Sequence, residues 1–90
     1  MNKTDLINTI TERSDLSKVE IESIVDEFLQ LIEDEVLKGE EVKLSNFGVF
    51  YKKARLARKG TNPSDGSPII IPANNTVGFR PSKILKEKLN

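Results

Sequence analysis

The basic residues of this chain are concentrated in one half of it. Residues 51–90 hold nine Lys and Arg against two acidic residues, a net charge of +7, whereas residues 1–50 hold five basic and twelve acidic residues, a net charge of −7. A polyanion responds to the local field within roughly 8–10 Å at physiological salt, so an overall charge of zero does not prevent phosphate binding. The second half is therefore a candidate nucleic-acid surface.

The residue types that most often carry out catalysis or bind metals are missing. The chain has no His and no Cys, which removes the commonest general bases, nucleophiles and transition-metal ligands. We therefore expect no enzyme activity, cofactor, metal site or small-molecule substrate. No apolar run approaches the roughly 20 residues that span a bilayer. The opening MNKTDL reaches an acidic residue at once, so we expect a cytoplasmic protein with neither a signal peptide nor a membrane partner.

A basic arm is predicted in the second half. Arg55, Arg58 and Lys59 precede a run of turn-forming residues that contains Asn62-Pro63, and Arg80 lies along the same ribbon or at its root. Arg and Lys side chains contact phosphates and enter the narrow minor groove. A proline ring at the tip is apolar and rigid, so it is suited to wedge between base steps and kink the duplex. Taken alone, however, Pro63 is most simply a turn former.

Two helices are predicted ahead of this basic region. The first covers residues 3–13, with Asn2 or Thr4 as its N-cap. The second begins at a capping box formed by Ser17 and Glu20 and ends before Gly39.

The second helix carries an apolar stripe of about 160°. This is wider than one packing partner needs, so we expect one part to face the protein's own sheet and another to face a second copy. The stripe comprises Ile21, Ile24, Val25, Phe28, Leu29, Leu31, Ile32 and Val36.

Strand patterns follow the helices. In residues 42–51, apolar residues alternate with polar ones at first, and β-formers follow. Ser45-Asn46 is predicted to be a turn, and Gly48 indicates a bulge or a close backbone approach. Strands return at residues 69–71 and 77–80, and Pro72 limits pairing to an edge or a strand end.

We predict one α+β domain over residues 1–90. It has two N-terminal helices, a three-stranded antiparallel sheet that extends into a flexible β-ribbon arm, and a short C-terminal helix. The helical dimerisation part covers 1–40, the sheet 41–81 with its arm at about 53–76, and the last helix 82–90.

The run Asn46-Phe47-Gly48-Val49-Phe50, followed by Arg55, Arg58, Gly60 and Asn62-Pro63, resembles the signature of the bacterial histone-like HU proteins and their relative, integration host factor. The resemblance extends over all 90 residues. It implies an intertwined homodimer whose two β-ribbon arms wrap, bend and compact double-stranded DNA in the bacterial nucleoid, favouring nicked or distorted DNA, with Pro63 as the intercalating wedge.

The resemblance also implies two sets of residues. Those implied to contact DNA are Lys3, Asn46, Gly48, Lys53, Arg55, Arg58, Lys59, Asn62, Pro63, Arg80, Lys83 and Lys86. Those implied to form the dimer core are Ile21, Val25, Phe28, Leu29, Ile32, Leu44, Phe47, Phe50 and Phe79.

The sequence departs from the family pattern at three positions. Thr61 stands where the family usually has a basic residue, Asp65 where it usually has a small polar or apolar one, and Asn46 where it often has glycine. The first two weaken the positive field at each arm tip, so we expect weaker binding or shorter wrapping than in a strongly basic relative.

Two alternative functions stay open. One is a site-specific DNA bender similar to integration host factor. Another is a dimeric scaffold that binds protein through its acidic half. RNA is a further candidate partner beside double-stranded DNA.

Overall fold

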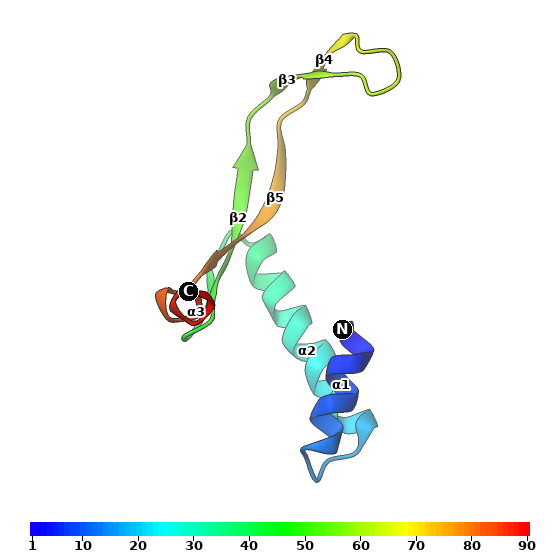
Figure 1. Cartoon of the computed structure of the whole chain (residues 1–90), viewed down its shortest axis with the longest axis vertical. Coiled ribbons are helices and arrows are strands. Elements are labelled where there is room, and N and C mark those ends of the chain that lie inside the picture. Colours follow the sequence, from blue (N-terminus) through cyan, green and yellow to red (C-terminus); the bar gives the residue numbers. More distant parts are fainter. The chain divides into compact units, whose positions relative to one another are not determined.

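Two capped helices form the first part of the chain. The computed structural model describes all residues from Met1 to Asn90, and these divide into two units, Met1–Asp34 and Glu35–Asn90. Helix α1 (Lys3–Glu12) and most of helix α2 (Lys18–Leu37) lie in the first unit (Figure 1). None of the helices combines the length and the apolar character that a membrane-spanning helix requires.

Side-chain caps determine where both helices begin. The Asn2 Oδ1 accepts from the Asp5 N–H at 2.9 Å, and the Asp5 carboxylate accepts from the Asn2 N–H at 3.0 Å. Asn2 is therefore the cap of α1, whereas Thr4 lies inside the helix. At α2, the Ser17 Oγ accepts from the Glu20 N–H at 3.2 Å and donates to the Glu20 carboxylate at 3.1 Å. The prediction of Ser17 as the N-cap is confirmed, but the box is incomplete, because the Glu20 carboxylate accepts from the Ser17 hydroxyl and not from the Ser17 N–H.

Little of the apolar stripe on α2 is covered by the chain itself. Ile7 on α1 and Ile21 on α2 are each only 4% exposed and form the interior of the first unit. In contrast, Phe28 is 49% exposed, and Ile24 and Leu31 are more exposed still. Ile21 is thus buried within its own chain, while most of the predicted dimer-core residues of α2 remain accessible.

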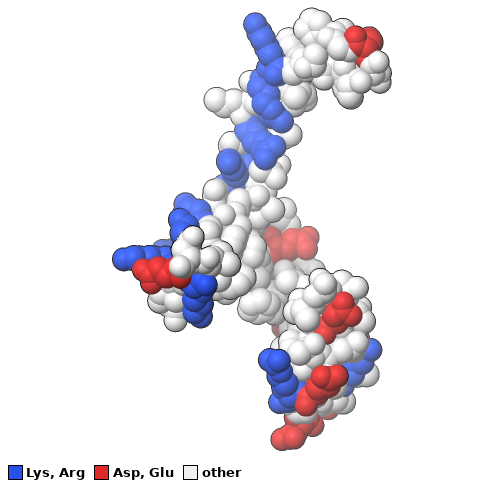
Figure 2. Space-filling view, in the orientation of Figure 1, with Lys and Arg blue, Asp and Glu red and all other residues white.

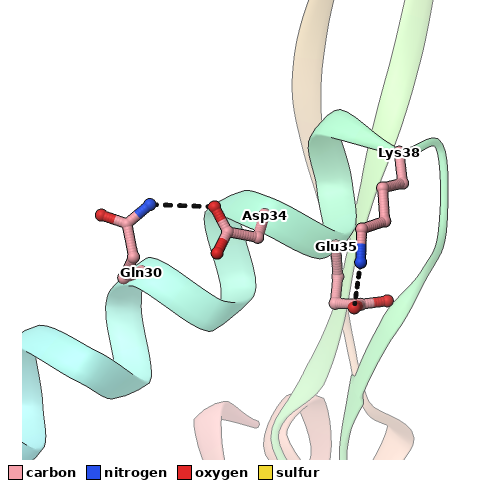
Figure 3. A network of polar contacts seen from close by, with 4 residues as sticks. All are labelled: Gln30, Asp34, Glu35 and Lys38. Carbon is pink, nitrogen blue, oxygen red and sulfur yellow. Dashed lines mark hydrogen bonds and ion pairs between the residues drawn. The ribbon is translucent and has the colours of Figure 1, made fainter.

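The polar surface of α2 carries short-range contacts of the kind expected for a solvated helix face. The Gln30 amide nitrogen donates to Asp34 at 2.9 Å, and the ammonium group of Lys38, the residue directly after the helix, lies 3.3 Å from Glu35 (Figure 3). These pairs are spaced four and three residues apart, where helical side chains are neighbours. The helix then ends before Gly39, whose φ of +85° is readily available to glycine.

The second unit contains a three-stranded antiparallel sheet. Its strands are β1 (Val42–Leu44), β2 (Gly48–Arg55) and β5 (Asn74–Pro81), in the order β1-β2-β5. Asn46 turns the chain between β1 and β2 with a φ of +63°, a conformation that Asn tolerates better than most residues. Helix α3 (Lys83–Leu89) follows β5, with Ser82 as its N-cap.

The arm has a pairing ladder of its own. Strands β3 (Arg58–Thr61) and β4 (Pro68–Ile71) form a separate two-stranded sheet, so the predicted ribbon is present but is not one continuous hairpin. Pairing stops between the Arg55–Asn74 and Arg58–Ile71 pairs. Pro72 lies in this gap, and because proline has no N–H it cannot continue the ladder.

One face of the three-stranded sheet is aromatic. Phe50 and Phe79 are directly paired, with ring centroids 4.9 Å apart, and the Phe47 ring lies 5.4 Å from that of Phe79. The Phe79 ring also covers Gly48, where an added Cβ would lie 2.5 Å from the ring. The same Cβ would lie 2.5 Å from the Arg80 carbonyl oxygen. The predicted close backbone approach at Gly48 is therefore confirmed, and the Phe79 ring adds a second contact there.

Candidate nucleic-acid interface

The register of the sheet places most of its basic side chains on the face opposite the phenylalanine rings. Arg80 pairs with Val49, Lys53 with Thr76 and Arg55 with Asn74. Because side chains alternate between faces along a strand, these residues lie on one side of the β2–β5 ribbon, and Phe50 and Phe79 on the other. We call this side the basic face; it comprises Lys43, Val49, Tyr51, Lys53, Arg55 and Arg80.

The arm continues the basic character of this face. Arg58 and Lys59 are consecutive in β3 and therefore project to opposite sides of the arm sheet. Neither they nor Lys53 and Arg55 form an ion pair. No acidic residue lies between residues 42 and 64. In Figure 2, Lys and Arg atoms accordingly follow the ribbon, and acidic atoms appear only at its tip.

Glycine and isoleucine pack the inner part of the arm. Gly60 pairs with Ile69, and an added Cβ at Gly60 would lie 2.8 Å from the Ile71 Cδ1. Glycine therefore lets Ile71 lie across β3 on the side that carries Arg58. Ile70 projects to the other side and is 77% exposed.

The tip is a closed loop with Pro63 on its surface. The Asn62 N–H donates to the Ser67 carbonyl at 2.7 Å, and the Gly66 N–H donates to the Asn62 carbonyl at 2.8 Å. The Asn62 Oδ1 also accepts from the Ser64 N–H at 2.9 Å. These bonds hold the ends of the loop together while the proline ring stays exposed.

Asp65 is the acidic residue of the tip, and it is engaged within the loop. Its Oδ1 accepts from the Ser67 hydroxyl at 2.6 Å and from the Ser67 N–H at 2.9 Å. These hydrogen bonds, the hydroxyl first, stabilise the carboxylate and lower the pKa of Asp65 below its ordinary value of 3.8. Asp65 is therefore ionised at neutral pH and places a negative charge close to Pro63.

Three of the predicted phosphate ligands have acidic neighbours. Arg80 lies 3.1 Å from Glu41, and Lys83 lies 3.9 Å from Glu87. In the first unit, Lys3 forms an ion pair with Asp26. The side-chain hydrogen bond to Asp26 raises the pKa of Lys3 above its ordinary value. A phosphate that binds any of these cations therefore meets a carboxylate already beside it.

The other predicted DNA contacts fall into two groups. Asn46 is exposed at the β1–β2 turn, and Lys86 is exposed on α3 and forms no ion pair. Gly48 is buried beneath Phe79. The structure gives Gly48 a packing role, and its contact with DNA stays a prediction.

Sequence reasoning missed two residues of the basic face. Lys43 pairs with Val49, and Tyr51 pairs with Gly78, on the same side as Lys53 and Arg55. For Tyr51, the signal was its odd-numbered position, shared with Lys53 and Arg55 along one strand. For Lys43, it was the alternation with Val42 and Leu44.

Comparisons with known proteins agree with this arrangement. A family model described as "Bacterial DNA-binding protein" matches residues 1–90. The chain is 47% identical over 87 residues to DNA-binding protein HU of Staphylococcus aureus (strain COL), covering 97% of each chain. It is 43% identical over 90 residues to DNA-binding protein HU-1 of Halalkalibacterium halodurans, covering 100% of each.

Solved structures give the same relationship. The HU chain of an Anabaena HU–DNA cocrystal matches with a TM-score of 0.90 at 31% identity, covering 99% of this chain and 97% of that one. HU from Thermotoga maritima matches with a TM-score of 0.69 at 27% identity, with full coverage of both chains.

Proposed function

The chain belongs to the HU family of bacterial DNA-binding proteins, and we propose that it wraps and bends double-stranded DNA with little preference for base sequence. In this role it compacts the bacterial nucleoid. The proposal rests first on the arm, where Lys53, Arg55, Arg58 and Lys59 have no acidic partner. Four unpaired cations on a narrow ribbon are free to bind phosphates on both sides of a groove.

The expected lack of sequence preference follows from the kind of contact that such an arm makes. Arg and Lys bind phosphate oxygens, which are the same at every base pair. The minor groove presents a degenerate pattern of donors and acceptors. Selectivity then comes from how easily the DNA deforms. Nicked or gapped duplexes are therefore the preferred targets, because part of their bending energy is already absent.

The wedge in this proposal is Pro63. Its ring is exposed on a loop that is closed by four backbone and side-chain hydrogen bonds within residues 62–67, in addition to the Ser67 hydroxyl bond. Such a loop loses little conformational freedom on binding, and a proline ring enters a base step without burying an N–H. Asn62 holds the loop closed from the preceding position.

The protein acts as a homodimer in this proposal. Phe28, Leu29 and Leu31 on α2 are about half exposed or more, and Phe47 in the sheet unit is 47% exposed. A second copy would cover these side chains and supply the second arm. An intertwined dimer explains why a stripe of about 160° on α2 exceeds what its own chain covers.

The function is tested by fluorescence anisotropy of labelled duplexes, intact and nicked, between about 50 and 200 mM salt. We expect tight binding that prefers the nick, weakens steeply with salt and weakens further in Pro63→Ala. Pro68→Ala is the matched control, since Pro68 is exposed in the same arm but lies outside the tip loop.

Each other outcome would contradict part of the proposal or favour another function. Equal loss in Pro63→Ala and Pro68→Ala would contradict the wedge. A strong preference for one selected duplex over random ones would indicate a site-specific bender. An RNA duplex that competes as well as DNA would make RNA a partner beside DNA. No binding at low salt would overturn the proposal and favour a protein-binding scaffold.

A further inference from the structure

Arg80 is held by two neighbours of different chemistry. Its guanidinium carbon lies 4.7 Å from the centroid of the Tyr51 ring, and its Nη2 lies 3.1 Å from the Glu41 Oε1. The Arg80 side chain is 56% exposed and that of Glu41 is 43% exposed. The guanidinium group therefore remains accessible from the basic face.

The Tyr51 ring reaches Arg80 because Gly78 lies between them. Tyr51 pairs directly with Gly78, and Arg80 is two residues further along the same strand and the same face. An added Cβ at Gly78 would lie 2.4 Å from the Tyr51 Cζ. The absence of a side chain at Gly78 thus allows the ring to lie across β5 and to contact the guanidinium group.

The two neighbours make different use of Arg80. A guanidinium group has five N–H donors and no acceptor. The face of the Tyr51 ring attracts the cation without occupying those donors, whereas Glu41 occupies a donor on Nη2 and neutralises the charge. A DNA phosphate needs the donors and the charge, but it does not need the space that the ring fills.

We propose that Tyr51, seated on Gly78, is a positioning residue that aims Arg80 at a DNA phosphate, and that Glu41 is an internal competitor that the phosphate must displace. This proposal rests on the proposed DNA-binding function and adds to it a residue that lowers affinity. Exposed ion pairs contribute little to stability, so Glu41 is readily displaced. It acts as a tuning residue and does not block the site.

The exchange has a signature in the dependence of binding on salt. Each phosphate contact with a free cation releases about 0.9 counterion equivalents. When a phosphate displaces Glu41, the freed carboxylate takes up a cation, and this offsets part of the release at that contact. Removing the carboxylate should therefore steepen the salt dependence by less than about 0.9 per site, with the effect counted twice for a dimer.

The experiment measures the binding of a labelled duplex by Glu41→Gln across the same salt series. We expect affinity at low salt to rise roughly two- to fivefold per site, with a steeper salt slope. Glu40→Gln is the matched control, because it removes the same charge from the neighbouring residue, which forms no ion pair. The affinity of Glu40→Gln for DNA should rise less than that of Glu41→Gln, and its salt slope should stay close to that of the wild type.

The Arg80→Gln background separates competition for Arg80 from a general effect of charge. In the Arg80→Gln protein, Glu41→Gln should no longer raise the affinity for DNA. If the advantage persists, or if Glu40→Gln matches Glu41→Gln, the competition is disproved while the proposed function stands. If the wild type binds no DNA at low salt, the proposed function fails and this inference fails with it.

The positioning role of the ring is tested separately. Tyr51→Phe keeps the ring and should bind as the wild type does. Tyr51→Leu keeps an apolar side chain but removes the aromatic face, and it should lose affinity in the Arg80 protein but not in the Arg80→Gln protein. Equal losses in both backgrounds would show a merely structural role and overturn this part of the proposal. Thermal unfolding of each variant confirms that it is folded.

Discussion

Phe50 and Phe79 face each other across β2 and β5, with ring centroids 4.9 Å apart. This pair determines which side of the ribbon is apolar, because the neighbouring residues must then project to the other side. Lys53 is three residues beyond Phe50 and lies on the opposite face, whereas Lys52 lies on the same face as Phe50.

Replacing each of these two adjacent lysines by alanine tests whether the basic face binds DNA. Lys53→Ala should weaken DNA binding and reduce the salt slope by about 0.9 per lost phosphate contact, or roughly twice that for a dimer. Lys52→Ala removes the same charge from the other face and should bind nearly as the wild type does. Anisotropy titrations over a salt series measure both quantities. Equal effects of the two substitutions would mean that the register does not decide which lysine meets DNA.

Gly78→Ala should destabilise the protein, because the new Cβ would lie only 2.4 Å from the Cζ of the Tyr51 ring. The ring or the strand must move, and overpacking of this kind costs about 1–3 kcal/mol. Denaturant unfolding measures the loss. In a Tyr51→Ser background the same substitution should cost much less. If it costs the same there, the ring is not the obstacle.

Phe28→Ala should weaken self-association, because Phe28 is 49% exposed in the chain and lies on the apolar stripe of α2. Burying a large apolar side chain contributes about 1.5–3 kcal/mol. Its loss should therefore raise the dissociation constant roughly tenfold or more. Sedimentation at several concentrations measures this. Val19→Ala is the control: Val19 is 77% exposed and lies off the stripe. A wild-type monomer would contradict the dimer outright.

Asp65 should titrate below its ordinary value of 3.8, since the Ser67 hydroxyl and N–H bind its ionised form. A lowered pKa means that these bonds contribute to order in the tip above the ordinary pKa, and that this contribution disappears as the pH falls through the lowered value. NMR titration of the Asp65 carboxyl and the Ser67 amide follows both events. Ser67→Ala should move the Asp65 pKa upward. An Asp65 pKa at or above 3.8 in the wild type would refute the tip contacts.

Local signals in the sequence predicted most of the elements. Ser17 and Glu20 mark the start of α2, and Gly39 its end, because caps depend on residues only a few positions apart. The turn at Asn46 and the turn-forming tip were predictable for the same reason. The interruption of the arm was only partly visible, since Pro72 indicated the end of a strand but not the two separate ladders.

By itself, the sequence determined the composition of the site: a basic, acid-free ribbon with a proline at its tip, in a chain with no His or Cys. Only the tertiary structure decided which cations are free and which are paired. Glu41 and Arg80 lie 39 residues apart, and the contact between Tyr51 and Arg80 depends on the β2–β5 register. Register is a property of two strands together, so a pattern read along one strand indicates alternation but not which residues meet across the sheet.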